Sequence, residues 1–135
     1  MSEETTFTTE EAREETIKRT DYLYIVSDSG LIISMSAELD HHLADEMREV
    51  IDDIIDSRGV VNVIFDFSKI GFMDSAGIGL IMGRYKKIRG RGQIYITGAN
   101  DSISRILLIS GLHKLVVRCE DVNEAVSKIR ESEAE

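Results

Sequence analysis

The stretch VVNVIFDF, Val60–Phe67, decides the fold class, because it is almost wholly apolar. A run of this length is typical of a central strand that is covered on both faces. Amphipathic helical patterns lie on both sides of it: one runs from Asp40 to Gly59, and another begins at Asp74 or Ser75. Helices that alternate with such a strand predict an α/β fold with a largely parallel sheet.

The segments further out continue this alternation. Tyr22–Ser27 and Leu31–Ala37 flank the turn-rich Asp28-Ser29-Gly30, and the second of them alternates apolar and polar residues, which predicts an antiparallel hairpin. Two more strands are expected at Gln93–Thr97 and Leu115–Cys119. The expected helices cover Asp40–Gly59, the segment between Ser75 and Gly90, Ile103–Ile109 and a final segment that carries Val122, Ala125, Val126 and Ile129. The predicted fold is therefore a mixed, mostly parallel β-sheet with an antiparallel edge hairpin, packed with about four α-helices.

The length and composition indicate a single globular domain. The chain has 135 residues, of which 42% are hydrophobic and 30% are charged, and we place the domain at residues 21–135. Residues 1–20 are rich in glutamate and poor in apolar side chains. We expect them to form an acidic, solvated and flexible N-terminal extension.

The charge and the cysteine content exclude several classes of function. A net charge of −9 disfavours direct binding to nucleic acid or to an anionic membrane surface. The sequence shows neither a signal peptide nor a run of about 18 apolar residues, so we expect a cytoplasmic protein. Cys119 is the single cysteine, and no spaced Cys and His set predicts a metal site.

The segment GFMDSAGIG, Gly71–Gly79, holds a lone serine at the predicted start of a helix. One interpretation is structural: Asp74 or Ser75 caps the helix, and the glycines pack closely against the sheet. A nucleotide loop is disfavoured, because with Gly83 the glycines are spaced G-x-G-x-x-x-G and no Lys-Ser or Lys-Thr pair follows. The hydrolase pattern G-x-S-x-G is absent as well.

A catalytic serine would also need a histidine within reach. The candidates are His41, His42 and His113, of which the first two are expected on the same rim of the sheet as Ser75. A histidine at a helix start is more often solvated than a general base. We therefore expect no catalytic residue and no enzymatic activity.

A further interpretation makes Ser75 the substrate of another protein. A phosphate is tolerated at a helix N-terminus, because the free N–H groups and the helix dipole favour negative charge. It would add about −1.5 to −2 charges and three acceptor oxygens to the surface. Phosphorylation could then block the docking of a partner without unfolding the domain.

Four motifs resemble those of the STAS-domain anti-sigma factor antagonists, most closely the members that act in sporulation. The resemblance runs from about Asp21 to Ile129. The motifs are ELDHH at 38–42, FMDSAGIG at 72–79, GRYK at 83–86 and SGLHK at 110–114. One departure matters: Ala76 replaces a second serine or threonine that is common in the family, which leaves Ser75 as the single acceptor.

The resemblance implies a STAS fold and a protein that binds an anti-sigma factor when unphosphorylated, thereby freeing the sigma factor for transcription. In that family the anti-sigma factor is also a serine kinase, and the position that it phosphorylates corresponds to Ser75. A serine phosphatase reverses the modification. ATP or ADP is expected on the kinase, and no cofactor is expected on this chain. The residues similar to the family's partner-binding surface are Asp40, Asp74, Ser75, Ala76, Gly77, Ile78 and Gly79.

Two points stay open in the sequence. The alternative function is a STAS binding module in a different partner-switching system, such as stress signalling, or in a transporter-associated system.

A basic patch within this acidic chain predicts a solvated helix end that complements the helix dipole, with partner contact as the second interpretation. The patch consists of Arg84, Lys86, Lys87, Arg89 and Arg91. Nothing in the sequence requires more than a monomer.

Overall fold

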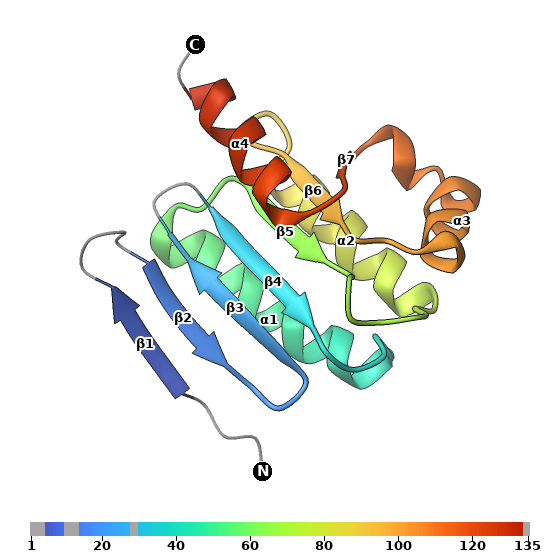
Figure 1. Ribbon diagram of the computed structural model, residues 1–135, viewed down its shortest axis with the longest axis horizontal. Coiled ribbons are helices and arrows are strands. Elements are labelled where there is room, and N and C mark those ends of the chain that lie inside the picture. Colours follow the sequence, from blue (N-terminus) through green and yellow to red (C-terminus); the bar gives the residue numbers. More distant parts are fainter. Residues whose placement is uncertain (1–4, 10–13, 28–29, 134–135) are drawn as a thin grey trace.

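The computed structural model describes residues 5–9, 14–27 and 30–133, and in this part of the chain one seven-stranded sheet forms the framework. The strands lie side by side in sequence order (Figure 1). Neighbours are antiparallel from the first to the fourth strand and parallel from the fourth to the seventh, so the predicted mixed α/β sheet is confirmed. The strands are β1 (Thr5–Thr9), β2 (Glu14–Lys18), β3 (Tyr22–Val26), β4 (Leu31–Met35), β5 (Val63–Asp66), β6 (Ile94–Thr97) and β7 (Val117–Cys119).

The helices cover both faces of the sheet. They are α1 (His41–Arg58), α2 (Ser75–Ile88), α3 (Asp101–Ser110) and α4 (Val122–Glu133), with a short 3₁₀ turn, η1 (Leu112–Lys114), after α3. Figure 1 shows α1 and α2 behind the sheet, α4 in front of it and α3 beyond the edge formed by β7. Because β4, β5 and β6 are consecutive parallel neighbours, right-handed connections place α1 and α2 on the same face.

The core follows the alternation of side chains along the strands. Leu31, Ile33 and Met35 of β4 are fully buried on the face that carries α1 and α2, as the alternating pattern predicted. In β5, Phe65 is buried on that face, while Ile64 belongs to a second cluster beneath α4. That cluster consists of Ile64, Tyr95, Ala125 and Ile129. The central strand predicted from VVNVIFDF is thus covered on both faces.

The N-terminal segment differs from the expected flexible extension. Thr5–Thr9 and Glu14–Lys18 form β1 and β2, which add two antiparallel strands outside the predicted hairpin. Ile17 is only 3% exposed and lies opposite Tyr24, so one apolar side chain and the backbone bonds to β3 fix this segment. Sequence composition missed it because an edge strand needs few apolar residues. Residues 1–4 and 10–13, and Asp28 and Ser29 of the predicted turn, lie outside the described residues.

Candidate functional site

The helices α1 and α2 begin side by side at one end of the sheet. Leu39 and Met73, which are almost fully buried, form an isolated parallel bridge just before the two helices. Each is followed by an aspartate and then by the first residue of its helix. The bridge therefore aligns Asp40 with Asp74, and the two helix starts form one surface, as the sequence predicted for a shared rim.

Both aspartates cap their helices. Asp40 Oδ1 accepts a hydrogen bond of 2.9 Å from the backbone N–H of Leu43. Asp74 Oδ1 accepts one of 2.8 Å from the backbone N–H of Ala76. Of the two caps considered for α2, Asp74 is the observed one. This leaves Ser75 as the first helical residue, with no capping task.

The side chain of Ser75 is free for chemistry by another molecule. Ser75 is exposed, and within the described residues its hydroxyl makes no hydrogen bond. It stands at the end of α2 where unpaired backbone N–H groups point outward. The position therefore combines an accessible hydroxyl with a local environment that tolerates an anion.

The two glycines after Ser75 have different surroundings. Gly77 is buried, and a Cβ atom added to it would lie 2.8 Å from Met73 Sδ and 3.0 Å from Leu39 Cδ2. Gly79 is exposed, and an added Cβ would meet no atom within 4 Å. Gly77 thus keeps α2 close to the bridging residues, whereas Gly79 leaves a bare stretch of helix surface open to an approaching molecule.

Phe72 is a surface residue that was not among the expected partner-binding residues. Its side chain is 53% exposed in the loop that leads from β5 to Ser75. Asn100 Nδ2 holds that loop by donating a hydrogen bond of 3.0 Å to the carbonyl oxygen of Gly71. No signal in the sequence could have found it, because an exposed phenylalanine and a buried one have the same chemistry.

A hollow between α1 and α2 adjoins this surface, and its charged groups pair with one another. His41, Arg48 and Ala76 are among its lining residues. Arg84 also lines it but is only 7% exposed, and its Nε lies 2.9 Å from Asp52 Oδ1. Burial lowers the pKa of the Arg84 guanidinium from its usual value, while Asp52 opposes that change. The sequence suggested that Arg84 belongs to a solvated patch, and this expectation is wrong because the side chain is buried.

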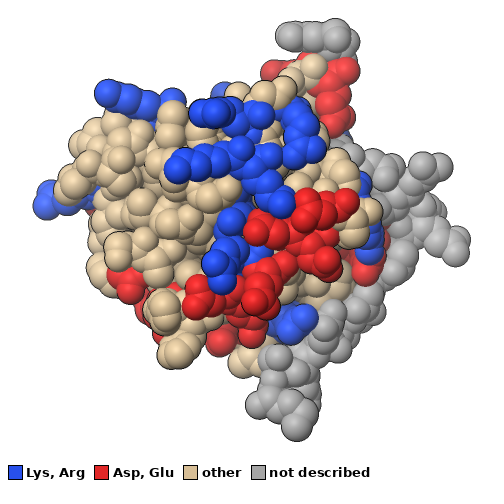
Figure 2. Space-filling view, turned by 180° about the vertical axis from the view of Figure 1, so that it is seen from behind, with Lys and Arg blue, Asp and Glu red and all other residues tan. Residues whose placement is uncertain are grey.

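The other cations of the predicted basic patch lie next to the acidic surface of α1. Figure 2 shows Lys and Arg side chains gathered beside a band of Asp and Glu on this face. Lys87 Nζ lies 3.0 Å from Asp56 Oδ1, and Arg91 donates a hydrogen bond of 2.9 Å to the Lys87 carbonyl oxygen. The patch is thus partly neutralised within the chain, which agrees with its interpretation as a helix end.

The histidines do not form a catalytic arrangement with Ser75. Within the part of the chain that the structure describes, no histidine is hydrogen-bonded to the serine. His41 and His42 pack edge to face with their ring centroids 5.4 Å apart, and His41 Nε2 lies 3.7 Å from Asp45 Oδ2. His113 belongs to η1, after α3. The triad geometry that a serine nucleophile needs is therefore not found among these residues.

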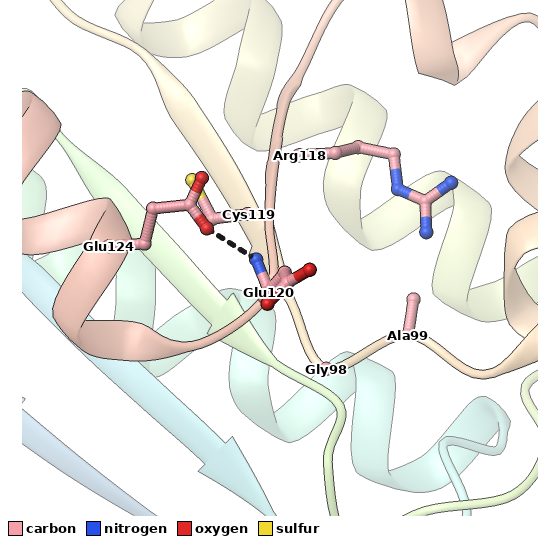
Figure 3. Close-up of a pocket in the computed structure, with 6 residues that line it drawn as sticks. All are labelled: Gly98, Ala99, Arg118, Cys119, Glu120 and Glu124. Carbon is pink, nitrogen blue, oxygen red and sulfur yellow. Dashed lines mark hydrogen bonds between the residues drawn. The ribbon is translucent and has the colours of Figure 1, made fainter.

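A second hollow lies where β6 and β7 end, and Figure 3 shows its lining residues. Glu124 Oε2 accepts a hydrogen bond of 2.8 Å from the backbone N–H of Glu120, and Arg118 donates one of 2.7 Å to Ser104 Oγ. Burial raises the pKa of the Cys119 thiol. The side chains of Glu124 and Arg118 are thus bonded within the chain, and burial favours the neutral thiol of Cys119.

The described residues give no sign of a metal site or a membrane span. No group of three or more His, Cys, Asp or Glu among them could hold a metal ion. None of the helices in this part of the chain is long and apolar enough to cross a membrane. The rim around Ser75 is therefore the feature that most needs a functional explanation.

Comparisons with known proteins identify the family. The model of the STAS domain matches residues 22–134. The chain is 38% identical over 87 residues to an anti-sigma F factor antagonist of Paenibacillus polymyxa, which covers 64% of this chain and 74% of that protein. The solved structure of the anti-sigma factor antagonist SpoIIAA in its unphosphorylated form matches with a TM-score of 0.74 at 26% identity, covering 82% of this chain and 96% of that one.

Another solved structure that matches is of a phosphorylated protein. The Bacillus cell fate determinant SpoIIAA in its phosphorylated form matches with a TM-score of 0.67 at 25% identity, covering 80% of this chain and 98% of that one. The predicted fold class and the predicted family are thus confirmed. The chain belongs to the STAS-domain family, and anti-sigma F factor antagonists are among its homologues.

Proposed function

We propose that this chain is an anti-sigma factor antagonist that is switched by phosphorylation of Ser75. When unphosphorylated, it binds an anti-sigma factor and releases the sigma factor for transcription. The observation that carries the proposal is the rim itself, where two helix starts are aligned beside Asp40 and Asp74 and where Ser75 is exposed and makes no hydrogen bond to any described residue. The homology to anti-sigma factor antagonists supports the same function.

In this proposal the anti-sigma factor is also the kinase. Its active site holds ATP, and the Ser75 hydroxyl oxygen forms a bond to the γ-phosphorus as the bond from that phosphorus to the bridging oxygen of ADP breaks. The serine proton passes to a base of the kinase, and ADP leaves. Ala76 offers no competing hydroxyl, so one phosphate is transferred for each chain.

The phosphate acts by excluding the partner. It adds about −1.5 to −2 charges beside Asp74, on a rim that otherwise presents a small neutral side chain and the bare surface of Gly79. A partner surface that fits this rim would then meet uncompensated negative charge, and like charges at an interface oppose binding strongly. A serine phosphatase restores the binding-competent form.

The proposal also covers the oligomeric state, the cofactors, the other partners and the location of the protein. It acts as a monomeric binding protein without a cofactor of its own and without enzymatic activity. The nucleotide belongs to the partner kinase. Neither nucleic acid nor a membrane is a direct partner, which agrees with the net charge of −9, and the protein works in the cytoplasm.

The test uses an anti-sigma factor from the same organism. Incubation with that factor and ATP should attach one phosphate to Ser75, as seen by mass spectrometry of peptides, and the unmodified chain should bind the factor in the presence of ADP. Ser75→Ala should abolish the phosphorylation and retain binding. Ser102→Ala is the matched control, because Ser102 is also an exposed serine in the first turn of a helix.

Two results would contradict the proposal. One is a phosphate that appears elsewhere in the chain while Ser75 stays unmodified. The other is the absence of any complex with the anti-sigma factor in ADP, which would instead favour a STAS module that serves a different signalling or transporter-associated partner.

A further inference from the structure

The outer face of α3 carries two of the three exposed large apolar residues of the described chain. Leu108 is 61% exposed and Ile109 is 77% exposed, and with Phe72 they are the exposed large apolar residues of the part that the structure describes. The inner face of the same helix packs against the core, since Ile103 and Leu107 are fully buried. Adjacent exposed apolar side chains of this size mark a contact surface more often than chance exposure.

The segment that holds these two residues has an excess of positive charge. The segment 99–119 carries Arg105, Lys114 and Arg118 against the single carboxylate of Asp101, whereas the whole chain has a net charge of −9. Arg105 and Lys114 are exposed, and neither side chain makes a hydrogen bond or an ion pair within the described residues. On α2, by contrast, Lys87 is paired with Asp56. The cations beside Leu108 are therefore available to carboxylates of another molecule.

The surface also contains a depression that can receive a side chain. A hollow of about 540 Å³ lies between α3, η1 and β7, and Leu108 and Val116 form part of its wall. Two arginines, Arg105 and Arg118, line it as well, together with His113 and the single carboxylate of Asp101. An apolar wall with a cationic rim fits an apolar side chain that is flanked by carboxylates.

This region is continuous with the rim around Ser75. The hydrogen bond of 3.0 Å from Asn100 to Gly71 joins the start of α3 to the loop that carries Phe72, and Figure 1 shows α3 beside the start of α2. A helix of 10 residues is about 15 Å long. A standard interface of about 800 Å² on each partner is roughly 30 Å across. One partner can therefore cover both regions.

We propose that the α3 surface, consisting of Arg105, Leu108, Ile109 and Lys114, is a second part of the docking surface for the anti-sigma factor. The anti-sigma factor meets it with an apolar patch rimmed by carboxylates. This inference rests on the proposed function. It separates two tasks: Ser75 and its neighbours sense the phosphate, whereas the α3 surface contributes affinity that the phosphate does not touch.

The experiment measures the dissociation constant of the full chain for the anti-sigma factor in ADP by isothermal titration calorimetry. The double variant Leu108→Ser/Ile109→Ser should raise Kd about 10-fold or more, as expected when central apolar anchors are lost. Arg105→Glu should raise Kd about 5-fold at low salt, and the effect should shrink as NaCl is added. Arg130→Glu, a charge reversal of an exposed residue on α4, is the matched control and should leave Kd unchanged.

The outcomes distinguish this inference from the proposed function. If the wild-type chain binds and the double variant binds within twofold of it, the α3 surface is not part of the interface and the inference is wrong. If the wild-type chain does not bind at all, the proposed function fails and the assigned partner fails with it. Thermal unfolding checks that each variant is folded, which the exposure of Leu108 and Ile109 leads us to expect.

Discussion

The surroundings of Gly77 and Gly79 lead to opposite predictions for the same substitution. Gly77→Ala would bring a Cβ to 2.8 Å from Met73 Sδ and 3.0 Å from Leu39 Cδ2. We expect it to lower the free energy of unfolding by about 1–3 kcal/mol, because overpacking of a tight contact forces neighbours to move. Gly79→Ala meets open space, and the helix propensity of alanine should raise the free energy of unfolding by about 0.5–1 kcal/mol.

Urea denaturation of the two variants checks both signs. Equal stability of Gly77→Ala and the wild-type chain would mean that Met73 can move aside and that the close approach is not required. Binding separates the two roles further, since Gly79→Ala should weaken the anti-sigma factor complex while the fold becomes more stable. A stable variant with unchanged affinity would place Gly79 outside the interface.

Ser75→Asp tests whether charge alone switches the surface. The variant should bind the anti-sigma factor at least about 10-fold more weakly, because the partner meets an uncompensated carboxylate at the rim. Its melting temperature should stay close to that of the wild-type chain, since Ser75 makes no hydrogen bond within the described residues and a helix start accepts negative charge. Ser127→Asp, the same change at an exposed position of α4, is the control.

If Ser75→Asp bound as tightly as the wild-type chain in the same titration, exclusion by charge would be wrong. A large drop in the melting temperature would point to a different role, in which the serine stabilises the start of α2. The two measurements therefore separate a switch from a structural residue.

At the scale of the helices, Asp40 has a structural role that can be separated from a role in binding. Asp40→Ala removes the bond to the Leu43 N–H and should lower the free energy of unfolding by about 1 kcal/mol. Asp40→Asn keeps a capping oxygen and should retain stability. If the carboxylate also contacts the anti-sigma factor, both variants should bind it more weakly.

Urea denaturation of the two Asp40 variants, and their titration with the anti-sigma factor, decide between a capping role and a contact role. Weaker binding by Asp40→Ala alone would make the aspartate a cap only. Weaker binding by both variants, with stability lost only in the alanine variant, would add a contact role to the cap.

The helices and central strands were predictable because local signals agreed with their packing. The amphipathic pattern of α1, its cap at Asp40 and its end at Gly59, whose φ of 67° is in the left-handed region, all have local signatures. The sequence also predicted that a helix begins at Asp74 or Ser75. It could not decide which of the two residues caps the N-terminus of that helix. In the structure Asp74 is the cap, and it directly follows Met73, whose bridge to Leu39 joins distant parts of the chain.

At the scale of the whole molecule, the features that the sequence did not predict depend on which side chains the assembled fold leaves exposed. The exposure of Phe72, Leu108 and Ile109 could not be read from apolarity, because buried residues have the same chemistry. Arg84 was expected in a solvated patch, yet its position between α1 and α2 buries it against Asp52. Sequence patterns thus predicted the helices and the strands from β3 onward and pointed to Ser75 as a candidate, whereas the first two strands and the extent of the candidate surface required the assembled fold.

The N-terminal strands lead to a prediction for the stability of the molecule as a whole. Ile17 of β2 is 3% exposed and belongs to the main core cluster, although it precedes the part that matches the STAS domain. Ile17→Ala should therefore lower the free energy of unfolding by about 2 kcal/mol or more. Lys18→Ala, at the exposed end of the same strand, should change it by less than about 0.5 kcal/mol.

A chain that begins at Asp21 extends this test. It should still fold, because the domain match starts at residue 22, but with a lower free energy of unfolding than the full chain, and β3 would then present an unpaired edge that promotes self-association. Urea denaturation and sedimentation velocity measure the two effects. If Ile17→Ala and the shortened chain were both as stable as the full chain, the first two strands would contribute nothing to the core, and the sequence-based view of a solvated extension would hold.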